Sequence, residues 1–224
     1  MVSPIKTRLA DLLEHDLFIP RELSWLSFNA RVLQEAADPT VPVIERLRYL
    51  GIFSNNSDEF FRVRVAEVRR LITVSSGAGK QEAKDLLAAI QKRVVDLQKE
   101  FDRIYASLMS ELAARKIYLV NERQLDAGQG AFVQAFFTDK VLPELEPILL
   151  RDGQAIPPLN DESLYLAVDI LSGKTYYSAV VDVPTDRLPR FIEIPRRKSK
   201  GGKVFIALDN IIRACLPQIF RGVI

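Results

Sequence analysis

Hydrophobic residues in the first part of the chain recur at three- and four-residue spacing, which predicts amphipathic α-helices. Ser24 can cap the first of these helices, and Asp38-Pro39 ends it. Its predicted inner face consists of Trp25, Phe28, Val32 and Leu33. Trp25 is therefore interpreted as a core residue.

Two further helices are predicted before residue 75. Pro42 suits the first turn of the second helix, and Gly51 is a natural C-terminal stop. Ser57 can then cap the third helix. The predicted inner positions are Val43, Leu47 and Leu50 in the second helix and Phe61, Val65, Val68 and Ile72 in the third. Residues 51–60 are accordingly expected to form a helix-to-helix corner.

The longest predicted helix runs from about Glu82 to Arg115 and would extend roughly 50 Å, at about 1.5 Å per residue. Its apolar stripe alternates strictly between three- and four-residue steps through Leu87, Ile90, Val94, Leu97, Phe101, Ile104 and Leu108. This alternation is typical of antiparallel helical bundles and coiled coils.

The hydrophobic period changes near residue 117, from helical spacing to short β-prone runs. The expected elements are strands at 117–120, 164–171, 175–183, 191–194 and 204–207, with helices at 132–142 and from Asp209. Ser172-Gly173-Lys174 is a hairpin signal, and Pro217 should end or kink the last helix. We therefore predict an all-α helical bundle with one long helix over residues 1–117, followed by an α+β domain over 118–224.

The second domain is expected to be truncated. The chain stops at Ile224 directly after several apolar residues, and the predicted strands make a small sheet for a complete domain. The pattern therefore indicates a multidomain protein of which this chain is a fragment.

The amino-acid composition excludes several classes of protein. The net charge is +2, carried by the first 120 residues, and the remainder is neutral. Neither part has the basic excess of a nucleic-acid-binding protein. The single cysteine excludes an intramolecular disulfide, no apolar run approaches a bilayer span, and the N-terminus lacks a signal-peptide core. We expect a soluble, cytoplasmic protein.

His15 is the only histidine, which limits the chemistry of the chain. Metal sites built on several histidines or cysteines are excluded, and a serine–histidine–aspartate triad would depend on this one residue near a terminus. His15 is interpreted as a surface residue, and no catalytic or metal-binding residue is predicted in this chain. Cys215, set between apolar residues, is interpreted as a small buried hydrophobe.

The Asn55-Asn56 pair is the first candidate binding site. Amide side chains match the edge of an adenine through paired donor and acceptor bonds, and a helix N-terminus beside them would offer N–H groups to an anion. The alternative interpretation makes both asparagines turn and cap residues, with Asp58 in the first helical turn. Spacing alone favours this structural interpretation.

Two basic segments are further candidates. Arg62, Arg64, Arg69 and Arg70 could hold phosphate oxygens, and the seven-residue spacing of Arg62 and Arg69 predicts one shared helix face. A solvated face, or pairing with glutamates nearby, is the more common arrangement. The Arg196–Lys203 loop could meet a polyanion or be a solvated loop, and its sequence does not fit a P-loop.

Several long sequence motifs resemble bacterial polyphosphate kinase of the long type with a phosphohistidine intermediate. These are Arg21-Glu22-Leu23-Ser24-Trp25-Leu26-Ser27-Phe28-Asn29, the run from Ile44 to Ile52, the Ser54-to-Phe60 segment, Asn121-Glu122-Arg123-Gln124-Leu125, and Leu208-Asp209-Asn210-Ile211-Ile212-Arg213. The similarity runs from about residue 18 to the end of the chain. It identifies the chain as the N-terminal domain and the beginning of the head domain.

The resemblance implies an enzyme that reversibly transfers the terminal phosphoryl group of ATP to inorganic polyphosphate with Mg²⁺, forming ADP. It implies a homo-oligomeric full-length enzyme and leaves its membrane association open. The family's phosphorylated histidine and most phosphate-binding residues lie in C-terminal domains, so His15 takes no catalytic role. The family's base-contacting asparagine corresponds to Asn56. Asn55, Asp58, Arg62, Arg69 and the Arg196–Lys203 loop receive no role from it.

Two other interpretations follow from the residues. The apolar stripe from Leu87 to Leu108 could pair between chains, as in a non-enzymatic helical interaction module. The Arg196–Lys203 loop would instead suit a polyanion-binding module, whose binding weakens with salt.

Overall fold

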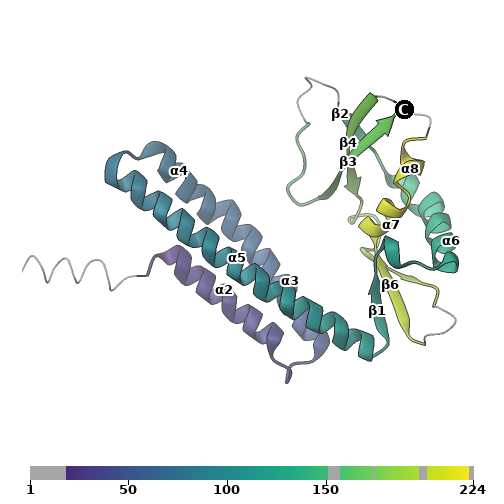
Figure 1. The fold of residues 1–224 in the computed structure, drawn as a ribbon, viewed down its shortest axis with the longest axis horizontal. Coiled ribbons are helices and arrows are strands. Elements are labelled where there is room, and N and C mark those ends of the chain that lie inside the picture. The colour runs from purple at the N-terminus through teal and green to yellow at the C-terminus, as the bar shows by residue number, and fades with distance from the viewer. Residues whose placement is uncertain (1–18, 151–156, 174, 197–200, 222–224) are drawn as a thin grey trace, which may run out of the picture. The chain divides into compact units, whose positions relative to one another are not determined.

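The computed structural model describes residues 19–150, 157–173, 175–196 and 201–221. The chain forms two compact units, unit 1 (Met1–Glu111) and unit 2 (Leu112–Ile224). Unit 1 is helical with one long helix, and unit 2 combines helices with two small sheets (Figure 1). The predicted fold class, helical and then α+β, is confirmed.

The described residues of unit 1 form three continuous helical segments. Short connections join these segments (Figure 1). Their elements are α2 (Arg21–Ala37), α3 (Val43–Glu59), the π-helical turn η1 (Phe60–Val65), α4 (Ala66–Val74) and α5 (Gly77–Ala114). The second segment consists of α3, η1 and α4, which follow one another without a break.

The predicted corner at residues 51–60 is wrong, because the helix continues through it. Gly51 lies within α3, and the backbone N–H of Phe60 donates to the carbonyls of Asn56 and Ser57. Ser57 does not cap a helix; its hydroxyl donates to the carbonyl of Phe53 one turn earlier, at 2.8 Å. The polar run from Ser54 to Glu59 is largely the solvent-facing side of a helix, with Asn56 and Ser57 partly covered.

The π-helical turn also changes which phenylalanine is buried. Phe60, Val65 and Val68 are 1–3% exposed, whereas Phe61, predicted to face inward, is 43% exposed. A π-helical turn takes in about one residue more than an α-helical turn, so positions five apart can share a face. The predicted 4-3-4 spacing from Phe61 assumed an undistorted α-helix and was wrong at its first position.

The face that the first helix buries matches the predicted face only in part, at Leu33. Its buried positions include Leu26, Asn29 and Leu33, while Phe28 is 57% exposed. Trp25 is half-buried and stacks on the ring of Phe60, with centroids 4.8 Å apart. The helix also begins at Arg21, with Pro20 rather than Ser24 at its N-cap.

The long helix α5 buries its predicted stripe inside unit 1. Ile90, Leu97, Ile104 and Leu108 are at most 4% exposed, and Phe101 packs against Phe53 of α3 with ring centroids 5.7 Å apart. The side chains of the stripe are therefore already buried within unit 1, which weakens the interpretation that the stripe pairs with a second chain.

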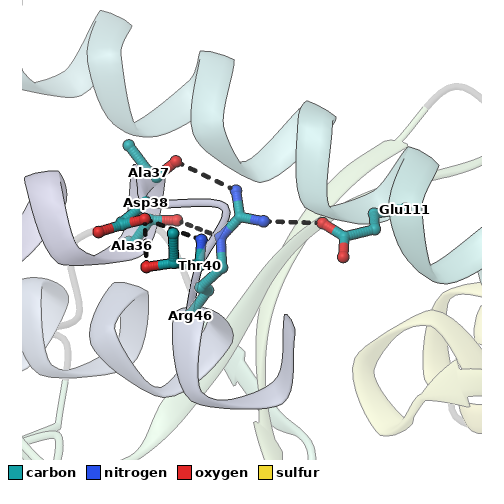
Figure 2. Close-up of polar contacts among 6 residues, drawn as sticks. All are labelled: Ala36, Ala37, Asp38, Thr40, Arg46 and Glu111. Carbon is teal, nitrogen blue, oxygen red and sulfur yellow. Dashed lines mark hydrogen bonds and ion pairs between the residues drawn. The ribbon is translucent and has the colours of Figure 1, made fainter. Parts of the chain in front are cut away.

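Arg46 joins three parts of unit 1 at one end of the bundle (Figure 2). This arginine is 5% exposed, and its guanidinium donates to the carbonyls of Ala36 and Ala37 at 2.8 and 3.4 Å. A third bond, at 2.7 Å, reaches the carboxylate of Glu111 near the end of α5. Arg46 thus supplies donors to carbonyls at the C-terminus of α2, where no helical N–H remains.

The described residues of unit 2 form two three-stranded sheets. Its strands are β1 (Ile117–Val120), β2 (Ile148–Leu150), β3 (Leu164–Ser172), β4 (Thr175–Val183), β5 (Phe191–Ile194) and β6 (Lys203–Ala207). One sheet has the order β1-β6-β5, in which β1 and β6 are parallel, and the other is the antiparallel sheet β2-β4-β3.

The helical segments of unit 2 are η2 (Glu122–Gln124), α6 (Ala127–Phe136), η3 (Phe137–Val141), η4 (Leu142–Glu144), α7 (Leu208–Ala214) and α8 (Leu216–Ile219). The predicted helix at 132–142 begins earlier, because Asp126 forms a capping box with Gln129. Pro217 lies in the first turn of α8, just after α7 has ended.

Strand predictions in unit 2 are largely confirmed. Ser172 pairs with Thr175, as the hairpin signal indicated. The three-residue strand β2 was not predicted, because its apolar run is too short to show a period. Cys215 is 1% exposed within the apolar core of this unit, as predicted, and burial raises the pKa of its thiol.

Candidate functional site

Asn56 lies in the last turn of α3, just before the π-helical turn. Its side chain is partly covered, whereas Asn55 and Asp58 are exposed. The helix therefore separates the two neighbouring asparagines, and only Asn56 is turned toward α2.

A buried partner holds the amide of Asn56. Its Nδ2 donates to the Oδ1 of Asn29 at 3.0 Å. Asn29 is fully buried in α2, and its own Nδ2 donates to the carbonyl of Phe53 at 3.1 Å and to the hydroxyl of Ser57 at 3.2 Å. A buried amide is costly unless its polar atoms are paired, so this network stabilises one arrangement of both side chains.

The amide of Asn56 keeps unused hydrogen-bonding capacity. Among the described residues, only Asn29 bonds to it, through one of its two N–H groups. Its Oδ1 and its other N–H remain available. An acceptor beside a donor is the pattern that pairs with the edge of an adenine.

An anion site at a helix N-terminus does not form here. The continuous helix places the backbone N–H groups of residues 57–60 inside it, where they meet carbonyls of the preceding turn. This part of the predicted corner was wrong. A ligand at Asn56 would be held by side chains rather than by free backbone donors.

The arginines beyond Asn56 are available to solvent. Arg62, Arg69 and Arg70 are exposed and Arg64 is half-buried, and no ion pair among the described residues includes any of them. Glu67 pairs instead with Arg21, at 2.7 Å. The spacing of Arg62 and Arg69 crosses the π-helical turn, so the argument that they share one helix face does not hold.

A cavity of about 260 Å³ lies on another side of α3, between this helix and α5. Phe53, Phe60, Phe61 and Phe101 line it together with polar groups such as Asp58. Asn56 is not among its lining residues. The amide of Asn56 and the cavity are therefore separate features of unit 1.

Two other candidates fall partly or wholly outside the described residues. His15 lies outside them, as do residues 197–200 of the basic loop. At the end of that loop, Lys203 lies 3.5 Å from the carboxylate of Glu193. The described part of the loop thus pairs one of its charges within unit 2.

Two further properties of the described residues concern metal clusters and membrane spans. No group of three or more histidine, cysteine, aspartate or glutamate side chains is placed to hold a metal ion in that part of the chain. Likewise, no helix among those residues is long and apolar enough to cross a membrane.

Sequence reasoning missed Asn29 and Arg46 as buried polar residues. Asn29 occupies a position in the stripe of Leu26, Leu33 and Ala36, which has the 3-4-3 spacing of a helix face. A polar residue inside an apolar stripe could have signalled a buried hydrogen-bonding role. The prediction followed the larger aromatic side chains instead.

Two sequence families match the chain, one after the other. The polyphosphate kinase N-terminal domain matches residues 18–120, and the polyphosphate kinase middle domain matches residues 128–224.

Curated relatives extend well beyond the matched segment. The polyphosphate kinase of Vibrio cholerae is 51% identical over 208 residues, which cover 92% of this chain and 30% of that protein. The polyphosphate kinase of Escherichia coli K12 is 44% identical over 211 residues, or 93% of this chain and 31% of that protein. The chain thus spans about 30% of the length of these relatives.

A solved structure agrees with the sequence matches. The crystal structure of polyphosphate kinase from Porphyromonas gingivalis superposes with a TM-score of 0.79 at 34% identity, covering 92% of this chain and 31% of that one. Both family domains, both relatives and this structure lead to the same assignment: the chain belongs to the polyphosphate kinase family, with its N-terminal domain followed by its middle domain.

Proposed function

We propose that this chain is the N-terminal part of an enzyme that transfers the terminal phosphoryl group of ATP reversibly to inorganic polyphosphate. The consecutive matches to two polyphosphate kinase domains support the proposal. The complete enzyme would be cytoplasmic and homo-oligomeric, and it would use Mg²⁺ held by residues of other domains. We place the boundary between the two domains at residues 117/118, where β1 has begun.

Within this enzyme, Asn56 contacts the base of the nucleotide. The observation that carries this role is the half-buried amide of Asn56. One of its N–H groups donates to Asn29, which leaves its Oδ1 and its other N–H for a ligand. Phosphoryl transfer depends mainly on positioning and on charge neutralisation. Asn56 contributes to the positioning, while the phosphates are held elsewhere.

The test uses the product of the complete reading frame and follows polyphosphate synthesis against ATP concentration. Asn56→Ala removes a contact made equally in the ground state and the transition state, so KM for ATP should rise about tenfold with little change in kcat. The matched control is Asn55→Ala, which removes the neighbouring exposed amide and should leave both constants unchanged. An unchanged KM in Asn56→Ala would contradict the base contact.

The 224-residue chain alone should make no polyphosphate and should bind ATP weakly, because in this family the phosphorylated histidine belongs to C-terminal domains. Calorimetry with ATP and an assay for polyphosphate on the purified chain check both statements. Measurable polyphosphate synthesis by this chain would contradict the proposal that catalysis requires the C-terminal domains.

A further inference from the structure

We infer that Asn29 locks the orientation of the Asn56 amide and thereby makes the base site prefer adenine over guanine. The inference rests on the base contact proposed above and adds a specificity-determining role for a residue that does not touch the nucleotide. It starts from a polar side chain that is completely buried between α2 and α3.

The orientation of Asn29 is set by the partners on its other side. Its amide nitrogen lies 3.1 Å from the carbonyl oxygen of Phe53 and 3.2 Å from the hydroxyl of Ser57. A backbone carbonyl can only accept a hydrogen bond, so the amide group of Asn29 must present its NH₂ there. Its Oδ1 must therefore point the other way, toward Asn56.

The orientation of Asn56 follows from that of Asn29. The Oδ1 of Asn29 can only accept, so Asn56 must offer its NH₂, and the two atoms lie 3.0 Å apart. A flipped Asn56 would bring two amide oxygens together in a partly buried place and lose the hydrogen bond. Asn56 is thus held with Oδ1 and one N–H directed away from Asn29.

This fixed polarity distinguishes the two purines. Adenine carries an amino donor next to a ring-nitrogen acceptor, which pairs with Oδ1 and N–H. Guanine carries the acceptor O6 where adenine has its amino group, so Oδ1 would face another acceptor. A freely rotating amide could turn over and donate its NH₂ to O6 of guanine, whereas an amide held by Asn29 cannot.

The experiment compares ATP and GTP as phosphoryl donors for the product of the complete reading frame. In Asn29→Leu the amide of Asn56 can turn over, so the ratio of kcat/KM for ATP to that for GTP should fall about tenfold. The change should appear mainly as a lower KM for GTP, with at most about a twofold rise in KM for ATP and kcat unchanged. Asn29→Ser gives the same expectation if the leucine variant does not fold, because a hydroxyl both donates and accepts.

Asn29→Asp distinguishes the effect of the fixed Asn56 orientation from the effect of altered packing at residue 29. Its carboxyl keeps an acceptor toward Asn56 whether or not it is protonated, so discrimination should stay within about twofold of the parent even though stability falls. Gln129→Leu is the matched control, because it removes another fully buried amide, in unit 2, and should leave the ATP-to-GTP ratio unchanged.

The possible failures can be told apart. If Asn56→Ala leaves KM for ATP unchanged, the proposed base contact is wrong and this inference is wrong with it. If Asn56→Ala raises KM while Asn29→Leu and Asn29→Ser keep the parental ratio, only the lock by Asn29 is overturned. An equal loss of discrimination in Asn29→Asp and Asn29→Leu would also overturn the lock, since packing would then explain both.

Discussion

The two units of this chain bury polar groups in different ways. Unit 1 buries the side chains of Glu22, Asn29 and Arg46 among its helices, whereas Gln129 is the only buried polar side chain among the described residues of unit 2. The strands of unit 2 are held in register by backbone hydrogen bonds, as in the nine residue pairs between β3 and β4. Helices satisfy their backbones internally, so neighbouring helices can be placed specifically only through side chains.

Buried polar contacts are therefore concentrated where helices meet. In unit 1 they supply the end of α2 with donors through Arg46 and orient the candidate base contact through Asn29. Replacing such groups leaves backbone carbonyls without donors, which costs more than the net value of the bonds themselves. Unit 1 should thus be more sensitive to changes in its buried polar residues, and unit 2 to changes in its backbone geometry.

Each unit carries its own spectroscopic or chemical probe. Trp25 is the only tryptophan and lies in unit 1, where its ring stacks on Phe60. Cys215 is the only cysteine and is buried in unit 2, and burial raises the pKa of its thiol. The thiol should resist a disulfide reagent until unit 2 unfolds, because the thiolate is the reactive form. Tryptophan fluorescence and thiol labelling therefore follow the two units separately.

The largest effect is expected at Arg46. Arg46→Leu removes the donors to the carbonyls of Ala36 and Ala37 and should destabilise unit 1 by about 3 kcal/mol. Urea unfolding followed by Trp25 fluorescence measures the change, while thiol labelling of Cys215 should move much less. The control is Arg48→Leu, which breaks an exposed ion pair with Glu45 and should cost at most about 0.5 kcal/mol. Similar losses in the two variants would contradict the role assigned to Arg46.

A substitution at Gly202 is expected to destabilise unit 2 and to leave the stability of unit 1 nearly unchanged. Gly202 has φ +113°, and a Cβ placed there would collide with the carbonyl and side chain of Lys116, directly before β1. Gly202→Ala should therefore destabilise unit 2 by about 2 kcal/mol, through backbone strain where β6 joins β1.

Thiol labelling of Cys215 at increasing urea concentration checks this prediction. Gly201→Ala is the matched control, because a Cβ at Gly201 would meet nothing within 4 Å. If Gly202→Ala shifted the Trp25 transition as much as the labelling of Cys215, the effect would not be confined to unit 2, which would contradict the prediction.

A smaller effect of opposite sign is expected at Gly51. This glycine lies inside α3, and a Cβ at Gly51 would meet no atom within 4 Å. Alanine is the better helix former, so Gly51→Ala should stabilise unit 1 by about 0.8 kcal/mol. Had Gly51 ended a helix in the left-handed conformation, the same change would destabilise the protein. The sign of the shift in the Trp25 transition decides between the two.

Long, regular patterns were predictable from the sequence, and local departures from them were not. The stripe from Ile90 to Leu108 in α5 and the β3–β4 hairpin both follow one period over many residues, so their elements were predicted correctly. The break expected at residues 51–60 relied on Gly51 and a polar run. In the structure, packing on α2 and α5 outweighs the low helix propensity of glycine, and the helix continues.

The candidate site was predictable in part. Asn56 was reached through similarity to a family, and spacing alone favoured a turn. Its partner Asn29 became apparent only in the folded structure, because the contact joins residues 27 positions apart in sequence. The π-helical turn at Phe60–Val65 was hidden as well, since its inserted residue shifts the helical period by a fraction of a turn. Such shifts decide which side chains meet, yet they leave little trace in a hydrophobic pattern.

The smallest predicted effect concerns Asp38, in the turn between α2 and α3 (Figure 2). Its carboxylate accepts bonds from the backbone N–H and the hydroxyl of Thr40, both at 2.8 Å. These two bonds, in that order, lower the pKa of Asp38, with a minor contribution from the charge of Arg46. A carboxyl whose pKa is lower in the folded state stabilises the protein above its unfolded-state pKa.

The stabilisation by Asp38 should therefore be complete at pH 7 and decline as the pH falls below about 4 and through the folded-state pKa. Asp38→Asn isolates this contribution, because its amide oxygen can still accept from Thr40 but carries no charge. The difference in unfolding free energy between the parent and Asp38→Asn, measured through Trp25, should be larger at pH 7 than at pH of about 2.5. A difference that stayed constant, or grew toward acid pH, would mean that the charge on Asp38 does not help to hold the turn that leads into α3.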